Sequence, residues 1–132
     1  MKNKKIIIIG GTGALGKQLT NRWDENNDIL IFSRNEHKQE DMKRIYPKPL
    51  YRIGDIKDKE SILRSMYEFK PDVIVNTAAL KTVWVAQDNP YETILTNIVG
   101  HQYLIDCVRE CRHQIESLMF ISTDKACSPV NV

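Results

Sequence analysis

The chain has no long apolar run, and this excludes a membrane-spanning helix. Such a helix needs about 18–20 consecutive apolar residues, whereas the apolar run at residues 6–9 has only the length of a strand. The basic residues 1–5 lead into this same short run, which does not fit the apolar core of a signal peptide. We therefore expect a cytoplasmic protein that does not enter a membrane.

Net charge and cysteine are also scarce. A net charge of +2 over 132 residues gives no reason to expect binding to nucleic acid or to an anionic membrane. The three cysteines lack the spacing of metal ligands. Cys107 and Cys111 share a face of a predicted helix, so a metal pair is conceivable, but no histidine or third cysteine completes a set. We therefore expect no metal site and interpret the cysteines as reduced residues of the core.

Four isoleucines at residues 6–9 are followed at once by a cluster of glycines. Such a run of β-branched residues is typical of a strand buried on both faces, and helical spacing resumes at residues 17–23. Two dinucleotide-binding patterns fit the cluster, Gly11-x-Gly13-x-x-Gly16 and Gly10-x-x-Gly13-x-x-Gly16. Between a strand and a helix, these glycines permit a tight turn, the approach of a pyrophosphate and close helix packing. An ordinary glycine-rich turn is the alternative, and a P-loop is excluded because no Gly-Lys-Ser/Thr follows.

Strand-like and helix-like segments alternate along the sequence. Strands are predicted at residues 6–9, 28–33, 50–53, 73–75 and 117–121, and helices at residues 17–23, 34–45, 58–69 and 91–112. This alternation predicts the α/β class, with a doubly wound parallel sheet of the Rossmann-like NAD(P)-binding type that is truncated after the fifth strand. Residues 1–132 are then one incomplete NAD(P)-binding domain, and a substrate domain is not part of them.

Small and polar residues gather where each predicted strand ends. They occupy residues 10–16, 33–34, 54–55, 76–79 and 122–125. Ligands of doubly wound sheets bind at the carboxyl ends of the strands. The clusters therefore predict a single binding cleft along that edge.

The end of the second strand carries no carboxylate. NAD-binding proteins place an acidic residue there for the ribose 2′-hydroxyl, but this chain has Ser33 and Arg34, with Lys38 one helical turn further on. A guanidinium suits a 2′-phosphate, so we expect NADP rather than NAD. The alternative is that Arg34 is only a solvated residue at a helix start. Asp55 is placed to bind the adenine amino group, unless it is simply an acidic turn residue.

Seven segments together resemble a known family. They are Gly-Gly-Thr-Gly-Ala-Leu-Gly, Ser-Arg-Asn-Glu-His-Lys-Gln, Gly-Asp-Ile-Lys-Asp, Asn-Thr-Ala-Ala-Leu-Lys, Asp-Asn-Pro-Tyr-Glu, Thr-Asn-Ile-Val-Gly and Ser-Thr-Asp-Lys-Ala. The chain resembles the extended short-chain dehydrogenases/reductases. It is most similar to the nucleotide-sugar 4,6-dehydratases of bacterial polysaccharide and flagellin-glycan biosynthesis, which act on UDP-N-acetylglucosamine. The resemblance extends from Lys5 to Val132.

The resemblance implies a role for each site residue. In this branch, bound NADP takes hydride from carbon 4 of the sugar, water is eliminated across carbons 5 and 6, and the hydride returns at carbon 6. Thr123 would bond the 4-hydroxyl, Asp124 and Lys125 would be the acid/base pair, and Lys81 would lie beside nicotinamide and substrate. An exposed turn is the alternative for Asp124 and Lys125. The implied cofactor-binding residues are Gly10, Thr12, Gly13, Ala14, Leu15, Gly16, Ser33, Arg34, Lys38, Asp55, Ile56, Ala78, Ala79, Lys81 and Asn97.

The chain also departs from this family. Thr82 and Trp84 stand where relatives have histidine and proline, and Trp84 either stacks on a ligand or packs. The helix that carries Tyr or Met and a Lys four residues later, and the substrate domain, are not among these residues, so we expect no turnover of UDP-N-acetylglucosamine by the chain alone. A complementing second half or a homo-oligomer is then a possible partner. The alternative functions are a nucleotide-sugar 4-epimerase, a catalytically inactive NADP-binding fragment and a poorly folding gene remnant.

Overall fold

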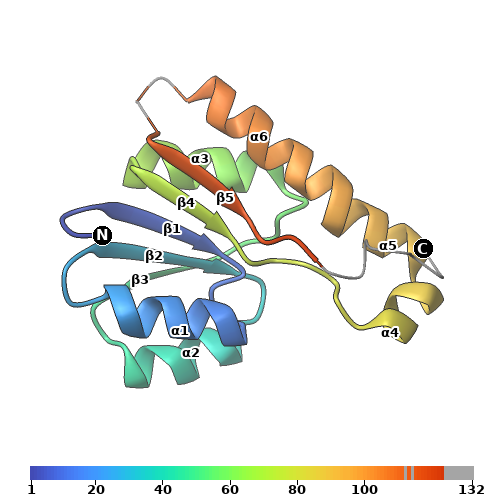
Figure 1. Ribbon diagram of the computed structural model, residues 1–132, viewed down its shortest axis with the longest axis horizontal. Helices are drawn as coiled ribbons and strands as arrows, with labels where there is room; N and C mark the ends of the chain where they lie inside the picture. The colour runs from blue at the N-terminus through green and yellow to red at the C-terminus, as the bar shows by residue number, and fades with distance from the viewer. Residues whose placement is uncertain (112, 114, 124–132) are drawn as a thin grey trace.

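Parallel strands form one sheet with helices on both faces (Figure 1). This computed structural model describes residues 1–111, 113 and 115–123. The strands are β1 (Lys5–Ile9), β2 (Asp28–Ser33), β3 (Leu50–Ile53), β4 (Val73–Asn76) and β5 (Ser117–Phe120). The helices are α1 (Ala14–Trp23), α2 (Glu36–Ile45), α3 (Lys59–Phe69), α4 (Val83–Asp88), α5 (Pro90–Ile94), the π-helical η1 (Leu95–Val99) and α6 (Gly100–Glu110).

The strand order is β3-β2-β1-β4-β5, and every pairing is parallel. The chain leaves β1 toward one edge through β2 and β3, then returns to the other side of β1 for β4 and β5. Ligands of such sheets bind outside the carboxyl ends of the strands, where the order reverses. The α/β doubly wound prediction is confirmed, and the reversal lies directly above the glycine cluster.

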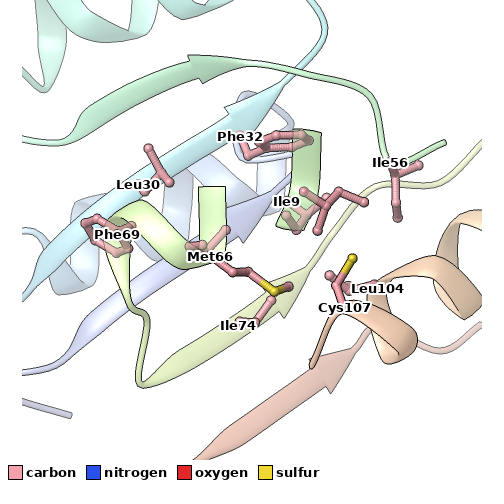
Figure 2. Packing of buried hydrophobic residues seen from close by; sticks show 11 residues of the cluster. Ile9, Leu30, Phe32, Ile56, Met66, Phe69, Ile74, Leu104 and Cys107 are labelled. Carbon is pink, nitrogen blue, oxygen red and sulfur yellow. The ribbon is translucent and has the colours of Figure 1, made fainter. Parts of the chain in front are cut away.

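The isoleucines of β1 are buried on both faces of the sheet. Ile6 and Ile8 pack toward α1 and α2, whereas Ile7 and Ile9 pack toward α3 and α6. Figure 2 shows the cluster that contains Ile9, in which Met66 of α3 lies between the sheet and α6. Full burial of one such side chain stabilises the fold by about 1.5–3 kcal/mol. The central strand therefore fixes both layers of helices and, with them, the edge at which the site lies.

Side chains cap two of the helices, and of these the cap at Asp58 is the one that the sequence predicts. The Asp58 side chain accepts from the Ser61 N–H at 3.0 Å and begins α3. The Asn35 side chain accepts from the Lys38 N–H at 2.9 Å and begins α2. Such caps satisfy N–H groups that have no partner within the helix. The cap at Asn35 also fixes where Arg34 leaves the sheet.

The predicted long helix is present from Pro90 to Glu110, but it contains a π-helical segment. The Gly100 N–H bonds to the Leu95 carbonyl, which widens one turn. The short helix α4 was not predicted, because its Val-Trp-Val start favours strands. Helices α4 and α5 lie beyond the carboxyl ends of β4 and β5 (Figure 1).

The two cysteines of the described residues are free thiols of the core. Burial raises the pKa of Cys107 to about 12, so this thiol stays protonated and unreactive. The Cys111 thiol lies 3.6 Å from the Met66 sulfur. The prediction of reduced core cysteines is confirmed for this pair, and Cys127 lies outside the described residues. Within that described part of the chain, no helix has both the length and the hydropathy to cross a bilayer.

Candidate functional site

A cleft of about 1040 Å³ runs along the carboxyl ends of the strands. One end is formed by residues that follow β2 and β3, and the other by residues that follow β4 and β5 together with η1 and α6. The predicted cofactor-binding residues that line it are Gly10, Thr12, Gly13, Ala14, Leu15, Ser33, Arg34, Lys38, Asp55, Ile56, Ala78, Ala79, Lys81 and Asn97. Thr123 lines it as well. Asp124 and Lys125 lie outside the described residues.

Gly16, the remaining member of the predicted set, does not line the cleft. A Cβ atom on Gly16 would lie 2.3 Å from the Gly11 carbonyl oxygen, so this glycine lets α1 pack against the turn. Gly10 has a φ of +75°, and a Cβ atom there would lie 2.7 Å from the Ala78 nitrogen. Both glycines therefore shape the protein itself. Gly16 therefore has the close-packing role that the glycine pattern predicts for one of its members, and it supports the cleft without lining it.

Gly13 differs from these two glycines because its backbone is exposed at the cleft. Its φ is −73°, and a Cβ atom would meet only the Gly10 carbonyl oxygen, at 3.3 Å. Gly13 is the N-cap of α1 and has no side chain to satisfy the first N–H groups of that helix. Those N–H groups and the helix dipole favour an anion at this position. The arrangement fits the pyrophosphate of a dinucleotide.

A buried glutamine fixes the end of β2. The Gln39 amide donates to the Ser33 hydroxyl oxygen at 2.9 Å and to the Arg52 carbonyl at 2.8 Å. It therefore ties β2 to β3 beneath the cleft. The role of Gln39 was not predicted from the sequence. Its spacing of three from the buried Met42, on an otherwise charged helix, was the available signal.

Four alternating charges meet at the β2–β3 end of the cleft. The Arg34 Nη1 atom lies 3.7 Å from Asp55 Oδ2 and 3.9 Å from a Glu92 carboxylate oxygen. The Lys57 ammonium group lies 3.6 Å from Asp55 Oδ2 and also pairs with Glu92. The hydrogen bond to Glu92 raises the pKa of Lys57, so Lys57 stays charged at neutral pH. Arg34 is thus held by carboxylates of two other segments, which sequence reasoning did not predict.

At the opposite end, Asn97 holds the loop that follows β4. Its side-chain oxygen accepts from the Leu80 N–H at 2.8 Å, and its amide donates to the Leu80 carbonyl at 2.9 Å. Asn97 therefore positions the segment that carries Lys81, which is exposed in the cleft. Trp84 does not line the cleft and is 72% exposed, so it does not pack in the core either.

Three polar atoms of cleft-lining residues lack a hydrogen-bond partner within residues 1–111, 113 and 115–123. They are Asn76 Nδ2, Thr96 Oγ1 and His101 Nε2. The His101 ring packs on Phe120, with ring centroids 5.0 Å apart. Thr96 is 3% exposed, and its helix is π-helical at this point. A buried polar atom without a partner costs about 1–3 kcal/mol.

Replacing Thr96 by valine is therefore expected to raise the free energy of unfolding by up to about 1 kcal/mol, because valine has the same shape and removes the unpaired hydroxyl. Urea denaturation measures this change. Thr93→Val is the matched control and is expected to destabilise, because the Thr93 hydroxyl donates to the Asn89 carbonyl at 2.9 Å. Equal destabilisation by both variants would show that the Thr96 hydroxyl does have a partner.

Comparison with known proteins adds an independent finding. A model of the family described as "polysaccharide biosynthesis protein" matches residues 6–132. The chain is 44% identical, over 100% of its length, to a UDP-N-acetylglucosamine 4,6-dehydratase (inverting) of Campylobacter jejuni, of which it covers 40%. It is 35% identical to a UDP-glucose 4-epimerase of Rickettsia canadensis, over 98% of this chain and 39% of that protein.

A solved structure shares the fold. The structure of Pen from Bacillus thuringiensis has a TM-score of 0.90 and 34% identity to this chain, over 98% of this chain and 40% of that one. The chain thus spans about 40% of the length of the relatives that it matches.

Proposed function

The chain belongs to the polysaccharide biosynthesis protein family, and we propose that it forms the NADP-binding part of a nucleotide-sugar 4,6-dehydratase. The substrate class would be UDP-N-acetylglucosamine and related UDP-sugars. The observation that carries this proposal is the exposed backbone at Gly13, inside a cleft that is also lined by Arg34 and Thr123. A dinucleotide can lie along such a cleft with its phosphates on bare main chain.

The residues present fit a bound NADP. The first N–H groups of α1 would hold the pyrophosphate, and Asp55 would accept a hydrogen bond from the adenine amino group. Arg34 and Lys38 would hold the 2′-phosphate. When bound, NADP supplies a hydride acceptor. The Asn97–Leu80 hydrogen bonds would keep Lys81 beside the reacting sugar.

The catalytic roles belong to the strand-end segment after β5. Thr123 would donate a hydrogen bond to the sugar's 4-hydroxyl. Asp124 would take the proton from carbon 5 of the sugar, and Lys125 would donate a proton to the 6-hydroxyl so that it leaves as water. An adjacent carboxylate and ammonium group suit this work because each biases the ionisation of the other.

Titration of NADPH into the purified chain tests cofactor binding. We expect saturable enhancement of nicotinamide fluorescence, and heat on binding in calorimetry. NADH serves as the comparison, because it has the same dinucleotide without the 2′-phosphate. Absence of binding by both coenzymes would contradict the proposal.

Arg34→Gln tests the preference for NADP over NAD. Hydrogen bonds to charged groups contribute about 1.5–3 kcal/mol, so we expect NADPH affinity to fall roughly 10-fold or more while NADH affinity changes little. Arg44→Gln is the matched control, because Arg44 pairs with Glu40 on α2 and does not line the cleft. Equal losses for both coenzymes on Arg34→Gln would argue against a 2′-phosphate contact.

A chimaeric enzyme tests the reaction. Residues 1–132 would replace the corresponding part of the Campylobacter jejuni relative, and the product from UDP-N-acetylglucosamine would be analysed by mass spectrometry. Loss of one water indicates a 4,6-dehydratase. A product of unchanged mass but altered chromatographic retention indicates a 4-epimerase, the alternative that the Rickettsia canadensis relative favours. A chimaera that binds NADPH without turnover favours a catalytically inactive fragment.

Assembly and location stay predictions. A homo-oligomer or a complementing second half is the expected protein partner, and the expected location is the cytoplasm. Analytical ultracentrifugation of the purified chain measures its oligomeric state.

A further inference from the structure

We propose that Glu92 lowers the preference of this cleft for a 2′-phosphate by competing with that phosphate for Arg34. The inference rests on the proposed function, since it presumes that NADP binds with its 2′-phosphate at Arg34. Glu92 lies in α5, far from Arg34 in the sequence, and does not itself line the cleft.

The ion pairs at this end of the cleft bring Glu92 within reach of Arg34. Its carboxylate lies 3.9 Å from Arg34 Nη1 and is also bonded to the Lys57 ammonium group. Asp55, the other acidic member, has Oδ1 occupied by the Lys57 backbone N–H at 3.0 Å. The Asp55 carboxylate is therefore fixed by a hydrogen bond within its own loop. Glu92 comes from α5 and reaches Arg34 only through its side chain.

The charge balance of the group explains the expected effect. Arg34 and Lys57 are cations, and Asp55 and Glu92 are anions, so the four side chains together are neutral. An incoming phosphate meets Arg34 already shared between the Asp55 and Glu92 carboxylates, so it must compete with Glu92 for the guanidinium group. NAD brings only an uncharged 2′-hydroxyl to this position, which does not compete for the Arg34 charge. Neutralising Glu92 should therefore change the binding of one coenzyme and leave that of the other unchanged.

Glu92→Gln is the test, because glutamine keeps the length of the side chain and its oxygen still accepts from Lys57. We expect affinity for NADPH to rise about three- to fivefold, the range for a partly exposed charge pair, while affinity for NADH stays the same. Adenosine 2′,5′-bisphosphate and 5′-AMP, measured by calorimetry, should show the same difference, since they probe only this end of the cleft. Glu110→Gln is the matched control, because Glu110 pairs with Lys59 away from the cleft.

A double-mutant cycle shows whether Glu92 acts through Arg34. In an Arg34→Gln background, Glu92→Gln is expected to leave NADPH affinity nearly unchanged. If Glu92→Gln alters NADPH and NADH affinities equally, Glu92 only anchors α5 and the inference is wrong. If the wild-type protein binds neither coenzyme, the proposed coenzyme binding itself is wrong. If Arg34→Gln leaves the preference for NADPH over NADH intact, the proposed 2′-phosphate contact at Arg34 is wrong.

Discussion

Replacing Gly13 by aspartate is expected to abolish NADPH binding without unfolding the protein. The new carboxylate would lie where the pyrophosphate is proposed to bind and would repel the phosphates. It would also accept hydrogen bonds from the first N–H groups of α1. Charge-assisted hydrogen bonds contribute about 1.5–3 kcal/mol each, so the loss in affinity should be about 100-fold or more. Fluorescence titration with NADPH measures it.

Stability makes this prediction specific. Gly13 is an N-cap with a φ of −73°, a conformation open to any residue, and aspartate is a favoured N-cap. The melting temperature should therefore stay the same or rise slightly. Gln18→Asp is the control, because Gln18 is exposed on α1 outside the cleft and receives the same charge. Full NADPH affinity in the Gly13→Asp protein would refute the phosphate position.

Gly16→Ala is expected to have the largest effect on stability. The added Cβ atom would lie 2.3 Å from the Gly11 carbonyl oxygen, which is backbone and has little freedom to move. Helix α1 would have to shift away from the turn, at a cost of about 3 kcal/mol or more. For a domain of this size, the melting temperature should fall by roughly 10 °C or more.

Gly13→Ala is the matched comparison for Gly16→Ala, since both substitutions add one methyl group to the same short segment. Its Cβ atom would meet one oxygen at 3.3 Å, so we expect a change in unfolding free energy below about 1 kcal/mol. Urea denaturation of both variants gives the difference. Similar values for the two would mean that Gly16 is not a packing contact.

The sequence predicted those parts of the fold that depend on local patterns. Residues 6–9 are buried on both faces because four isoleucines leave no polar face, and Asp58 caps a helix because its side chain reaches an N–H three residues away. It did not predict α4, whose residues favour strands, or the π-helical turn at Leu95–Val99. Both segments depend on tertiary packing beyond the carboxyl ends of β4 and β5.

The site was predictable to a similar extent. The glycine pattern located Gly13, because a strand, a glycine cluster and a helix in that order define a local backbone geometry. Gln39 and Glu92 were missed, since each acts through contacts between distant segments that no local pattern encodes. The same pattern assigns one glycine to close helix packing, which is the role of Gly16, and another to the proposed phosphate position, which is Gly13.

In the proposed cofactor site, the dinucleotide phosphates lie against the start of α1. Titrating NADPH while following backbone amide resonances measures this directly. We expect the largest saturable shifts at Gly13, Ala14 and Leu15, with smaller shifts at Arg34 and Ala78. Saturable NADPH binding that leaves the amide resonances of residues 13–15 unmoved, or no binding at all, would contradict this phosphate position.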